Sequence, residues 1–462
     1  MTRYIVFVAM LISIYMLANR GPQEAFLKAW LPFFLMLPFN FFVDIPGLPD
    51  PNFMQAAILP ILFVLARDYL PVMRFGRMEI LLLLYVAVRV FNDYLGRGYS
   101  DAQNYAFYML SSLIGPYLMG CYLIDSRRMD IATSKMFVLI FLLFFPTFVY
   151  EMKFFVSPVF KALSPLFPNA GSGLSIRYGL ARTAGTFEHP ILAAVMIIAV
   201  YRMHKWLDWV GEWDKPQEGL LGIIQKFAAK FPFSFKNQIS IILITMAIMT
   251  ISRGPWIGGF AGATLVAVGN TKQRKKWLIL VAFIFIVGGV VGKTALDIYL
   301  TPVAGEVMSE QATTMLYRQV MVDEYMKFLI EKMWTGWGLT TVPSIAGMES
   351  IDNAFFLMAL QHGVLAPTVF FLIFLYAIGT QIALGLKAPV GEPPLGFTFS
   401  GIYLMCFIAF TTVYMGAQTE PMLFLLLGWG ESIKNRPASD SASSTGQPLI
   451  AEPSHPFRRV IY

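Results

Sequence analysis

The fold is decided by residues 239–276, which read ISIILITMAIMTISRGPWIGGFAGATLVAVGNTKQRKK. Two apolar blocks, 239–251 and 256–269, flank a very tight polar turn, and a basic cluster follows the second block. Apolar blocks of about bilayer length, roughly 17–25 residues at full span, separated by short charged breaks are the pattern of membrane-crossing helices. We therefore expect two neighbouring spans here, with Arg253 at the turn between them.

The same pattern covers most of the chain. Of its 462 residues, 57% are hydrophobic and 14% are charged, whereas a soluble globular domain carries roughly 25% charged residues. We predict an all-α, polytopic transmembrane helical bundle of about 12–14 spans. The membrane domain is expected over residues 1–433. The candidate spans are residues 4–18, 30–43, 53–66, 78–95, 105–123, 133–150, 189–203, 239–251, 256–269, 277–292, 364–386, 397–413 and 422–433.

Loop charge predicts the orientation. Lys and Arg gather at 67–77, 127–135, 202–236 and 272–276, which is every second loop. Cytoplasmic loops are the basic ones, so the long segments 151–188 and 293–361 are expected on the external side. The second of these segments has apolar residues near helical spacing between positions 311 and 334, which predicts an amphipathic surface helix.

The two ends of the chain are expected to differ. The first apolar block resembles a signal peptide, but cleavage would leave Arg20 and Lys28 outside, so we predict an uncleaved span. After residue 433 the composition turns to Ser, Pro and Asp, and residues 434–462 are predicted to form a disordered cytoplasmic tail.

Several ligand classes are not expected. The four His and two Cys residues form no cluster in the sequence, so we predict neither a bound metal nor another cofactor. The net charge of +7 is accounted for by the basic cytoplasmic loops, so we expect no nucleic-acid partner.

Ionisable residues at the external ends of spans are the candidates for chemistry. Arg177 and Arg182 lie in residues 176–190, IRYGLARTAGTFEHP. Arg253 follows Ser252 at a tight turn, Arg318 lies in the amphipathic stretch, and Asp352 precedes the next apolar segment. A single external arginine is usually a residue that extends to the lipid headgroups. Several that converge would suit a phosphate ligand, because the guanidinium group is planar and stays charged.

These motifs together resemble a known family. The stretches RTAGTFEHP (182–190) and SRGPW (252–256), then Arg318, WTGWG (334–338), DN (352–353) and HGV (362–364), are similar in order and span position to the O-antigen ligase and polymerase family. The motifs agree over roughly residues 177–386, and the hydropathy agrees over nearly the whole chain. Each motif is short, and their combination at the correct span ends carries the resemblance.

The resemblance implies a multi-pass enzyme of the bacterial inner (cytoplasmic) membrane whose active site faces the periplasm. Such enzymes transfer an undecaprenyl-pyrophosphate-linked oligosaccharide to a hydroxyl of an acceptor glycan without a metal or another cofactor. Membrane lipids surround them, and a polysaccharide flippase and a chain-length regulator are implied as pathway partners. By the same resemblance, Asp352, Arg253 and Arg182 are the catalytic candidates. The pyrophosphate-binding candidates are Arg177, Arg182, Arg253 and Arg318, and the secondary candidates are His189, Asn353 and His362.

Alternatives stay open at this point. Ligases of the family, which deliver glycan to lipid A–core, resemble His-Asn where this chain has Asp352 and Asn353. The Asp-Asn pair looks more like polymerases of O-antigen, capsule or exopolysaccharide, and an aspartate partly removed from water can act as a base. We therefore favour a polymerase over a ligase. Asp352 could instead cap the helix that follows it. A lipid-linked glycan transporter without chemistry is the alternative of another class, although its repeated halves are not visible here.

Overall fold

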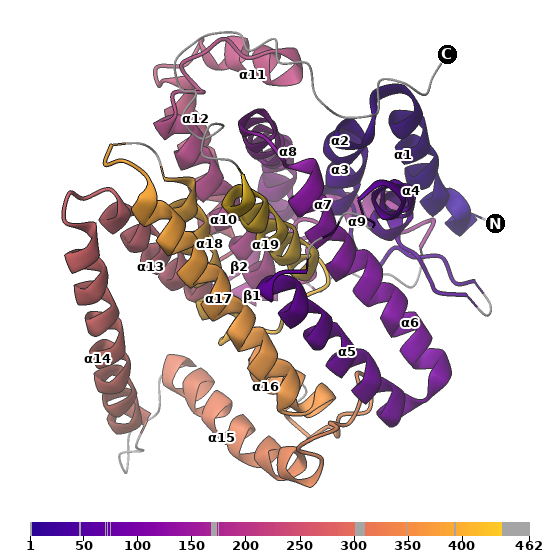
Figure 1. The fold of residues 1–462 in the computed structure, drawn as a ribbon. Coiled ribbons are helices and arrows are strands. Elements are labelled where there is room, and N and C mark those ends of the chain that lie inside the picture. The colour runs from indigo at the N-terminus through magenta and orange to yellow at the C-terminus, as the bar shows by residue number, and fades with distance from the viewer. Residues whose placement is uncertain are drawn as a thin grey trace.

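The computed structural model describes residues 2–45, 48–69, 71, 73, 75–167, 173, 175–300, 310–348, 350–391 and 394–436. Within these residues the protein is a bundle of helices with one two-stranded hairpin (Figure 1), which confirms the predicted all-α class. Most of the predicted tail, residues 437–462, lies outside the described residues.

The elements follow one another along the chain in this order: α1 (Phe7–Arg20), α2 (Pro22–Ala25), α3 (Leu31–Met36), α4 (Phe53–Asp68), α5 (Arg77–Arg97), α6 (Tyr99–Met109), α7 (Gly115–Leu123), α8 (Arg127–Phe154), α9 (Pro158–Leu163), β1 (Ser175–Arg177), β2 (Leu180–Arg182), α10 (Pro190–Trp209), α11 (Gly219–Ala228), α12 (Phe235–Met249), α13 (Arg253–Gly269), α14 (Arg274–Leu300), α15 (Glu310–Glu331), α16 (Ala354–His362), α17 (Leu365–Lys387), α18 (Leu395–Phe410) and α19 (Thr419–Asn435). Short irregular helical turns at Thr2–Val6, Phe26–Trp30 and Leu110–Ile114 precede α1 or join neighbouring helices.

Five stretches of helix among the described residues are long and apolar enough to cross a bilayer: Arg3–Arg20, Tyr99–Leu123, Arg127–Phe154, Pro190–Trp209 and Leu365–Lys387. The shorter apolar helices α12 and α18 pack among them. A multi-span helical protein is therefore confirmed, and the count of about 12–14 spans stays a prediction.

Glycines let α13 and α18 pack with their backbones in close contact. A Cβ at Gly258 of α13 would lie 2.8 Å from the carbonyl oxygen of Met405 in α18, and one at Gly262 would overlap the backbone of Gly401. Small residues four apart let two backbones touch, which is how helices associate in a lipid environment. This contact fixes the start of α13 beside the end of α18, where the candidate site is found.

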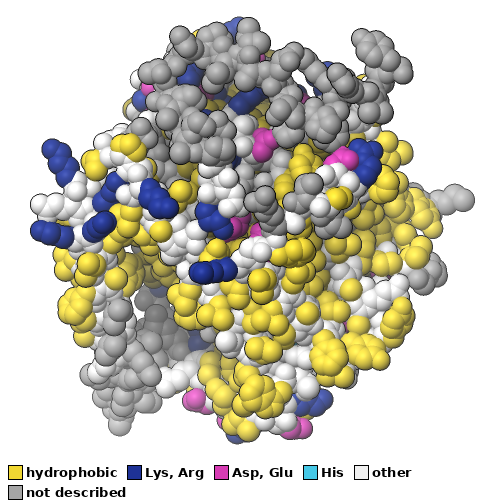
Figure 2. Space-filling model, in the orientation of Figure 1, with side chains coloured by type: hydrophobic (Ala, Val, Ile, Leu, Met, Phe, Trp, Pro, Cys, Tyr) yellow, Lys and Arg dark blue, Asp and Glu magenta, His cyan; other side chains and the backbone are white. Residues whose placement is uncertain are grey.

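The two ends of the bundle differ in character. α11 lies at one end and α15 at the other (Figure 1). Figure 2 shows a broad hydrophobic surface across the middle of one face, with Lys and Arg side chains gathered at its upper left, over the turn between α13 and α14. The start of α13 lies at the opposite end of that helix from this basic turn. The arginine-bearing motifs therefore stand away from the basic loops.

Candidate active site

A short hairpin that the sequence did not predict forms the first part of the site. β1 and β2 pair antiparallel, with Arg177 opposite Leu180. Tyr178 and Gly179 form the two-residue connection, and their φ angles are 56° and 73°. Two consecutive residues with positive φ are what a tight hairpin turn of this type needs. The turn places Arg177 and Arg182 on neighbouring strands.

Both hairpin arginines contact the turn between α12 and α13. Arg182 is buried; its Nε donates to the carbonyl oxygen of Thr250 at 3.2 Å, and its Nη2 donates to Ser252 Oγ at 3.0 Å. The Nη1 atom of Arg177 donates to the carbonyl oxygen of Ile251 at 3.3 Å. The guanidinium fork can make several such bonds at once. The structure therefore brings both arginines to the turn that contains Arg253.

The turn itself is strained. Ile251 has a φ angle of 49°, a left-handed conformation that costs roughly 1–2 kcal/mol for a residue with a Cβ atom. A β-branched residue is rarely found there, and such strain concentrates at functional sites. The turned backbone offers the carbonyl oxygens of Thr250 and Ile251 to the two arginines. The strained turn therefore also supplies the carbonyl oxygens that bind the two arginines.

Arg253 is the first residue of α13 and is exposed. Its Nη2 atom donates to the hydroxyl oxygen of Tyr178 at the hairpin tip. The first N–H groups of a helix point along its axis without intrahelical partners, and the helix dipole adds positive potential at that end. The start of α13 therefore combines a guanidinium group with a helix terminus, which together favour an anion.

The second part of the site comes from α15 and the segment before α16. Arg318 Nη2 lies 3.5 Å from Asp352 Oδ2 and donates to the carbonyl oxygen of Thr412 at 3.4 Å. Ser350 Oγ donates to Asp352 Oδ1 at 2.8 Å. A Cβ at Gly254 would lie 2.7 Å from Thr412 Oγ1. The start of α13 and the Arg318–Asp352 pair therefore flank the same residue after α18.

The site holds an excess of positive charge. Burial lowers the pKa of Arg182 to about 10, and Arg177 lowers it in the same direction, while Asp352 acts in the opposite direction. Arg182 therefore stays protonated near neutral pH. Within the described part of the chain, no carboxylate comes within ion-pair distance of Arg177, Arg182 or Arg253. Three guanidinium groups thus surround one turn without a paired anion.

His189 contributes no charge to this cluster near neutral pH. Burial lowers its pKa to about 4, and Arg182 and Arg177 act in the same direction. Its Nδ1 atom accepts a hydrogen bond from the backbone N–H of Ile191 at 3.1 Å, so the neutral ring carries its proton on Nε2. His189 is the N-cap of α10, which is a structural role that does not depend on any reaction.

Asn353, and not Asp352, is the N-cap of α16. The Oδ1 atom of Asn353 accepts from the backbone N–H of Phe356 at 3.0 Å. The capping alternative for Asp352 is therefore wrong, because the side chain one residue later occupies that position. Asp352 is left with Arg318 and Ser350 as partners. Its carboxylate is about 30% exposed, which leaves it accessible.

His362 lies apart from the arginine cluster. It ends α16, eight residues or roughly 12 Å along the helix from Ala354. The ring is fully buried, stacks on Tyr105, and places Nε2 3.1 Å from the Tyr105 hydroxyl. The structure therefore groups His362 with α6, and not with Arg182 and Arg253.

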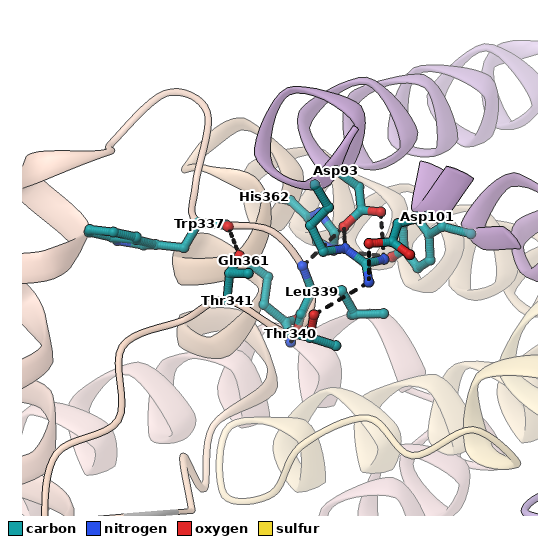
Figure 3. Close-up of polar contacts among 10 residues, drawn as sticks. Asp93, Asp101, Trp337, Leu339, Thr340, Thr341, Gln361 and His362 are labelled. Atoms are coloured by element: carbon teal, nitrogen blue, oxygen red, sulfur yellow. Dashed lines mark hydrogen bonds and ion pairs between the residues drawn. The ribbon is translucent and has the colours of Figure 1, made fainter. Parts of the chain in front are cut away.

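The WTGWG motif attaches the long segment to α5 (Figure 3). Asp93 accepts two hydrogen bonds from Arg97 at 2.8 and 2.7 Å, and its Oδ1 atom also accepts the backbone N–H of Leu339 at 3.0 Å. Trp337 N donates to the carbonyl oxygen of Leu360 at 2.8 Å. The close-up shows Asp93 and Asp101 on the α5–α6 side facing the loop that carries Leu339. This attachment holds the segment against the bundle and thereby helps to place α16.

Sequence reasoning missed a buried ion pair beside this attachment. Arg89 Nη1 lies 2.5 Å from Glu420 Oε1, with both side chains less than a tenth exposed, and Tyr108 donates to the other carboxylate oxygen at 2.6 Å. The partners are far apart in sequence. The available signal was a charge inside the apolar block 78–95, which is costly in a membrane unless it is paired.

A second missed residue shapes the RTAGT segment. The buried carboxylate of Glu151 accepts the backbone N–H groups of Ala184 and Gly185 at 3.0 and 2.8 Å. A buried carboxylate that accepts two such bonds is satisfied without a cation. Glu151 therefore anchors the chain just after Arg182 and before His189. The described residues contain no group of three or more His, Cys, Asp or Glu side chains that could hold a metal.

Residues 238–371 match a protein-family model described as O-antigen ligase, and no curated protein sequence matches the chain. The matched range contains Arg253, Arg318 and Asp352, and the hairpin arginines precede it. This match confirms the resemblance to the O-antigen ligase and polymerase family. Together with the apolar helices, it supports a membrane glycosyltransferase of that type, for which a lipid-linked glycan and an acceptor are the implied substrates.

Proposed function

We propose that this chain, as a membrane glycosyltransferase of the O-antigen ligase and polymerase type, joins undecaprenyl-pyrophosphate-linked repeat units into a polymer at the periplasmic face of the inner membrane. The observation that carries the proposal is the group of Arg177, Arg182 and Arg253 around one strained turn, with no described carboxylate paired to any of them. A flippase that supplies the units and a regulator of chain length are the partners this activity would need.

A diphosphate is the ligand that fits this charge. Arg182 and Arg177 are held by neutral backbone and hydroxyl oxygens, so their positive charge is oriented and not cancelled. Arginine binds phosphate oxygens with two parallel N–H groups. Arg253 adds an exposed guanidinium at a helix N-terminus, where backbone N–H groups also favour anions. We assign the diphosphate of the donor to this cluster, with Arg318 at its edge.

The proposed reaction is a displacement at the anomeric carbon of the donor sugar. The bond from that carbon to the diphosphate oxygen breaks, and the leaving diphosphate keeps the electron pair. The acceptor hydroxyl oxygen forms the new bond to the carbon and gives its proton to the Asp352 carboxylate. Fixed cations that face the leaving group lower the barrier because they need no reorganisation. A positioned base contributes typically 10²–10⁴-fold.

A base role for Asp352 agrees with its surroundings. The carboxylate is partly exposed and is free of the helix cap, and it has one cationic partner, Arg318, at 3.5 Å. Its partner Arg318 donates to the carbonyl oxygen of Thr412, and the start of α13 packs on the same residue, so the carboxylate and the arginine cluster flank one segment. We place the acceptor between them.

The test is polymer length in a reconstituted system. The purified chain is mixed with lipid-linked repeat units, and the glycan products are separated by size. We expect long polymer from the wild type and single units from Arg253→Ala. The matched control is Arg128→Ala, because Arg128 is exposed near the start of α8 and the residue that contacts the RTAGT segment, Glu151, lies near the other end of that helix.

Three outcomes separate the candidate functions. Full-length polymer from Arg253→Ala contradicts the proposed site. Glycan that appears on added lipid A–core in place of polymer identifies a ligase, the activity named by the matched family description. Movement of the lipid-linked unit across the membrane with no new glycosidic bond identifies a transporter.

A further inference from the structure

Helix α11 turns apolar side chains outward, and the proposed function does not use it. Leu221, Gly222 and Ala228 pack toward the bundle and are buried. Ile223 and Phe227, by contrast, are 66% and 60% exposed, and they lie four residues apart on one side of the helix. A surface helix of a soluble protein turns charged or polar groups to that side. The exposed residues, which we call the α11 stripe, are Leu220, Ile223, Phe227 and Phe231.

Contacts at both ends hold the α11 stripe in one orientation. Before the helix, the Gln217 N–H donates to Gln225 Oε1 at 2.9 Å, and Gln217 Nε2 donates to the carbonyl oxygen of Glu212 at 2.7 Å. At its other end, Gln238 Nε2 of α12 donates to the carbonyl oxygen of Ala228 at 2.8 Å. A helix of ten residues is marginal by itself in water. These contacts with its neighbours therefore fix which side of α11 faces outward.

Two lysines run along one edge of the stripe. Lys226 and Lys230 are exposed, and the Nζ atom of Lys230 lies 5.7 Å from the centroid of the Phe227 ring. Among the described residues, no carboxylate lies within ion-pair distance of either lysine, whereas the nearby Lys215 and Lys236 are paired with acidic side chains. The stripe therefore carries positive charge at its edge that the chain itself does not neutralise.

The place of α11 in the fold indicates what covers the stripe. The helix lies across one end of the bundle (Figure 1), in the basic loop between α10, which is long and apolar enough to cross a bilayer, and α12. Phe231 and Phe233 are exposed in the short connection to α12. The exposed side of α12 continues with Ile241, Ile244 and Ile248. Because this side of a predicted span faces acyl chains, the stripe extends a lipid-facing surface toward the headgroups.

An apolar stripe edged by lysines matches the boundary between acyl chains and headgroups. A helix in this plane buries its apolar side about 5–10 Å deep and turns Lys or Arg to the headgroups. The flexible lysine stem lets the ammonium group reach a phosphate while its carbons stay on apolar surface. A zwitterionic lipid would cover the stripe, but it would bring no net negative charge to Lys226 and Lys230. The charge therefore favours an anionic phospholipid.

We propose that α11 lies in the headgroup region of the leaflet on the basic-loop side, which the charge pattern predicts to be the cytoplasmic one, and binds anionic phospholipid there. Leu220, Ile223 and Phe227 insert between the ends of the acyl chains, and Lys226 and Lys230 contact the phosphates. The inference does not rest on the proposed function, because lipid binding by α11 needs no glycan and no transfer.

The experiment uses the full-length protein in bilayers of phosphatidylcholine and phosphatidylglycerol, with bromine atoms on the acyl chains of one lipid at a time. Ile223→Cys carries an uncharged bimane fluorophore, which bromine quenches only at short range. The protein without this substitution measures any label on Cys121 and Cys406. Glu218→Cys, at an exposed position just before the helix, is the matched control outside the stripe. We expect strong quenching at position 223 and little at position 218.

The lysines are tested by their effect on lipid preference. We expect brominated phosphatidylglycerol to quench the label on Ile223→Cys more than brominated phosphatidylcholine does. Adding Lys226→Gln or Lys230→Gln should lower this preference about fivefold each, which corresponds to about 1 kcal/mol for one lysine near an anionic surface. Lys161→Gln, which changes an exposed lysine in α9, should leave the preference unchanged.

Each result supports or overturns lipid binding by α11. Quenching at position 223 no stronger than at position 218 overturns the proposal, because the stripe would then lie outside the bilayer. Equal quenching by the two lipids, or a preference that survives both lysine substitutions, overturns the binding of anionic lipid. Quenching that weakens as more protein is added to the same amount of lipid shows that a second copy covers the stripe, which also overturns it. None of these results depends on polymer formation, which tests the proposed function separately.

Discussion

Replacing Asp352 by Asn separates chemistry from folding. In the structure Asp352 pairs with Arg318 at 3.5 Å, and the two side chains are 30% and 35% exposed. Ion pairs this accessible to water contribute about 0–1 kcal/mol to stability. The amide oxygen of Asn can still accept the hydroxyl of Ser350. We therefore expect Asp352→Asn to lower the free energy of unfolding by no more than about 1 kcal/mol.

The expected effect of this substitution on turnover is much larger. If Asp352 takes the proton of the acceptor hydroxyl, its loss lowers the rate by about 10²–10⁴-fold, which is about 2.7–5.4 kcal/mol in the barrier. The rate is measured as repeat units joined per minute with saturating lipid-linked substrate, and stability as the thermal midpoint in the same detergent. The matched control is Asp323→Asn, an exposed aspartate on α15, which should leave both quantities unchanged.

Comparing the change in rate with the change in thermal midpoint separates a catalytic role of Asp352 from a structural one. A rate for Asp352→Asn within about threefold of wild type is too small a change for a general base and would refute this role. A loss of activity that is matched by a large fall of the thermal midpoint would mean that Asp352 supports the fold and not the reaction.

The other predictions concern single positions. Arg182→Lys keeps the charge and loses the planar fork, so turnover should fall about tenfold to a hundredfold, as expected for one lost charge-assisted bond; turnover close to wild type in the polymer assay argues against this role. Gly336→Ala forces a side chain at a φ angle of 69° into the backbone of Gln361, whereas Gly347→Ala, with φ of 78°, meets open space. Thermal midpoints should show the first variant less stable by about 1–3 kcal/mol, and equal midpoints would count against the overlap. The unfolded chain binds a proton on His189 near pH 6.5 but the folded protein only near about 4, so wild-type stability should fall as the pH drops through this interval. His189→Asn, which keeps a capping acceptor, should lose less stability between about pH 7.5 and 5, and parallel losses would contradict the pKa assignment.

The sequence predicted the helical class for a physical reason, and it also singled out one arginine of the candidate site. Long apolar blocks rarely form structures other than membrane helices. An arginine at a tight external turn is unusual enough to single out Arg253. That Arg182 meets this turn does not follow from the sequence, which places both motifs at external span ends and does not show that they converge. Their hydrogen-bond partners could not be predicted, since they depend on the backbone of Thr250 and Ile251.

Other features depend on details that a single sequence does not contain. Either Asp352 or Asn353 can cap a helix by residue type, and one residue of register decided between them. The left-handed conformation of Ile251 opposes its own preference, so it must be imposed by packing. Arg89 and Glu420 pair across most of the chain length, and a charge in an apolar block indicates that a partner exists without identifying it.

Arg182 is held by neutral acceptors, so the site keeps its positive charge for a reaction. A carboxylate partner would stabilise Arg182 more strongly, yet it would also cancel the positive potential and compete with a phosphate for the same N–H groups. The acceptors in the structure are a carbonyl oxygen and hydroxyl groups, which orient the guanidinium without cancelling its charge. The cost is visible in the pKa of Arg182, lowered to about 10 mainly by burial, and in the strained backbone of Ile251. At neutral pH this pKa still leaves only on the order of 0.1% of the side chains uncharged. Charge that develops on a departing diphosphate would therefore meet cations already in place, and interactions that strengthen as that charge grows are the ones that accelerate a reaction.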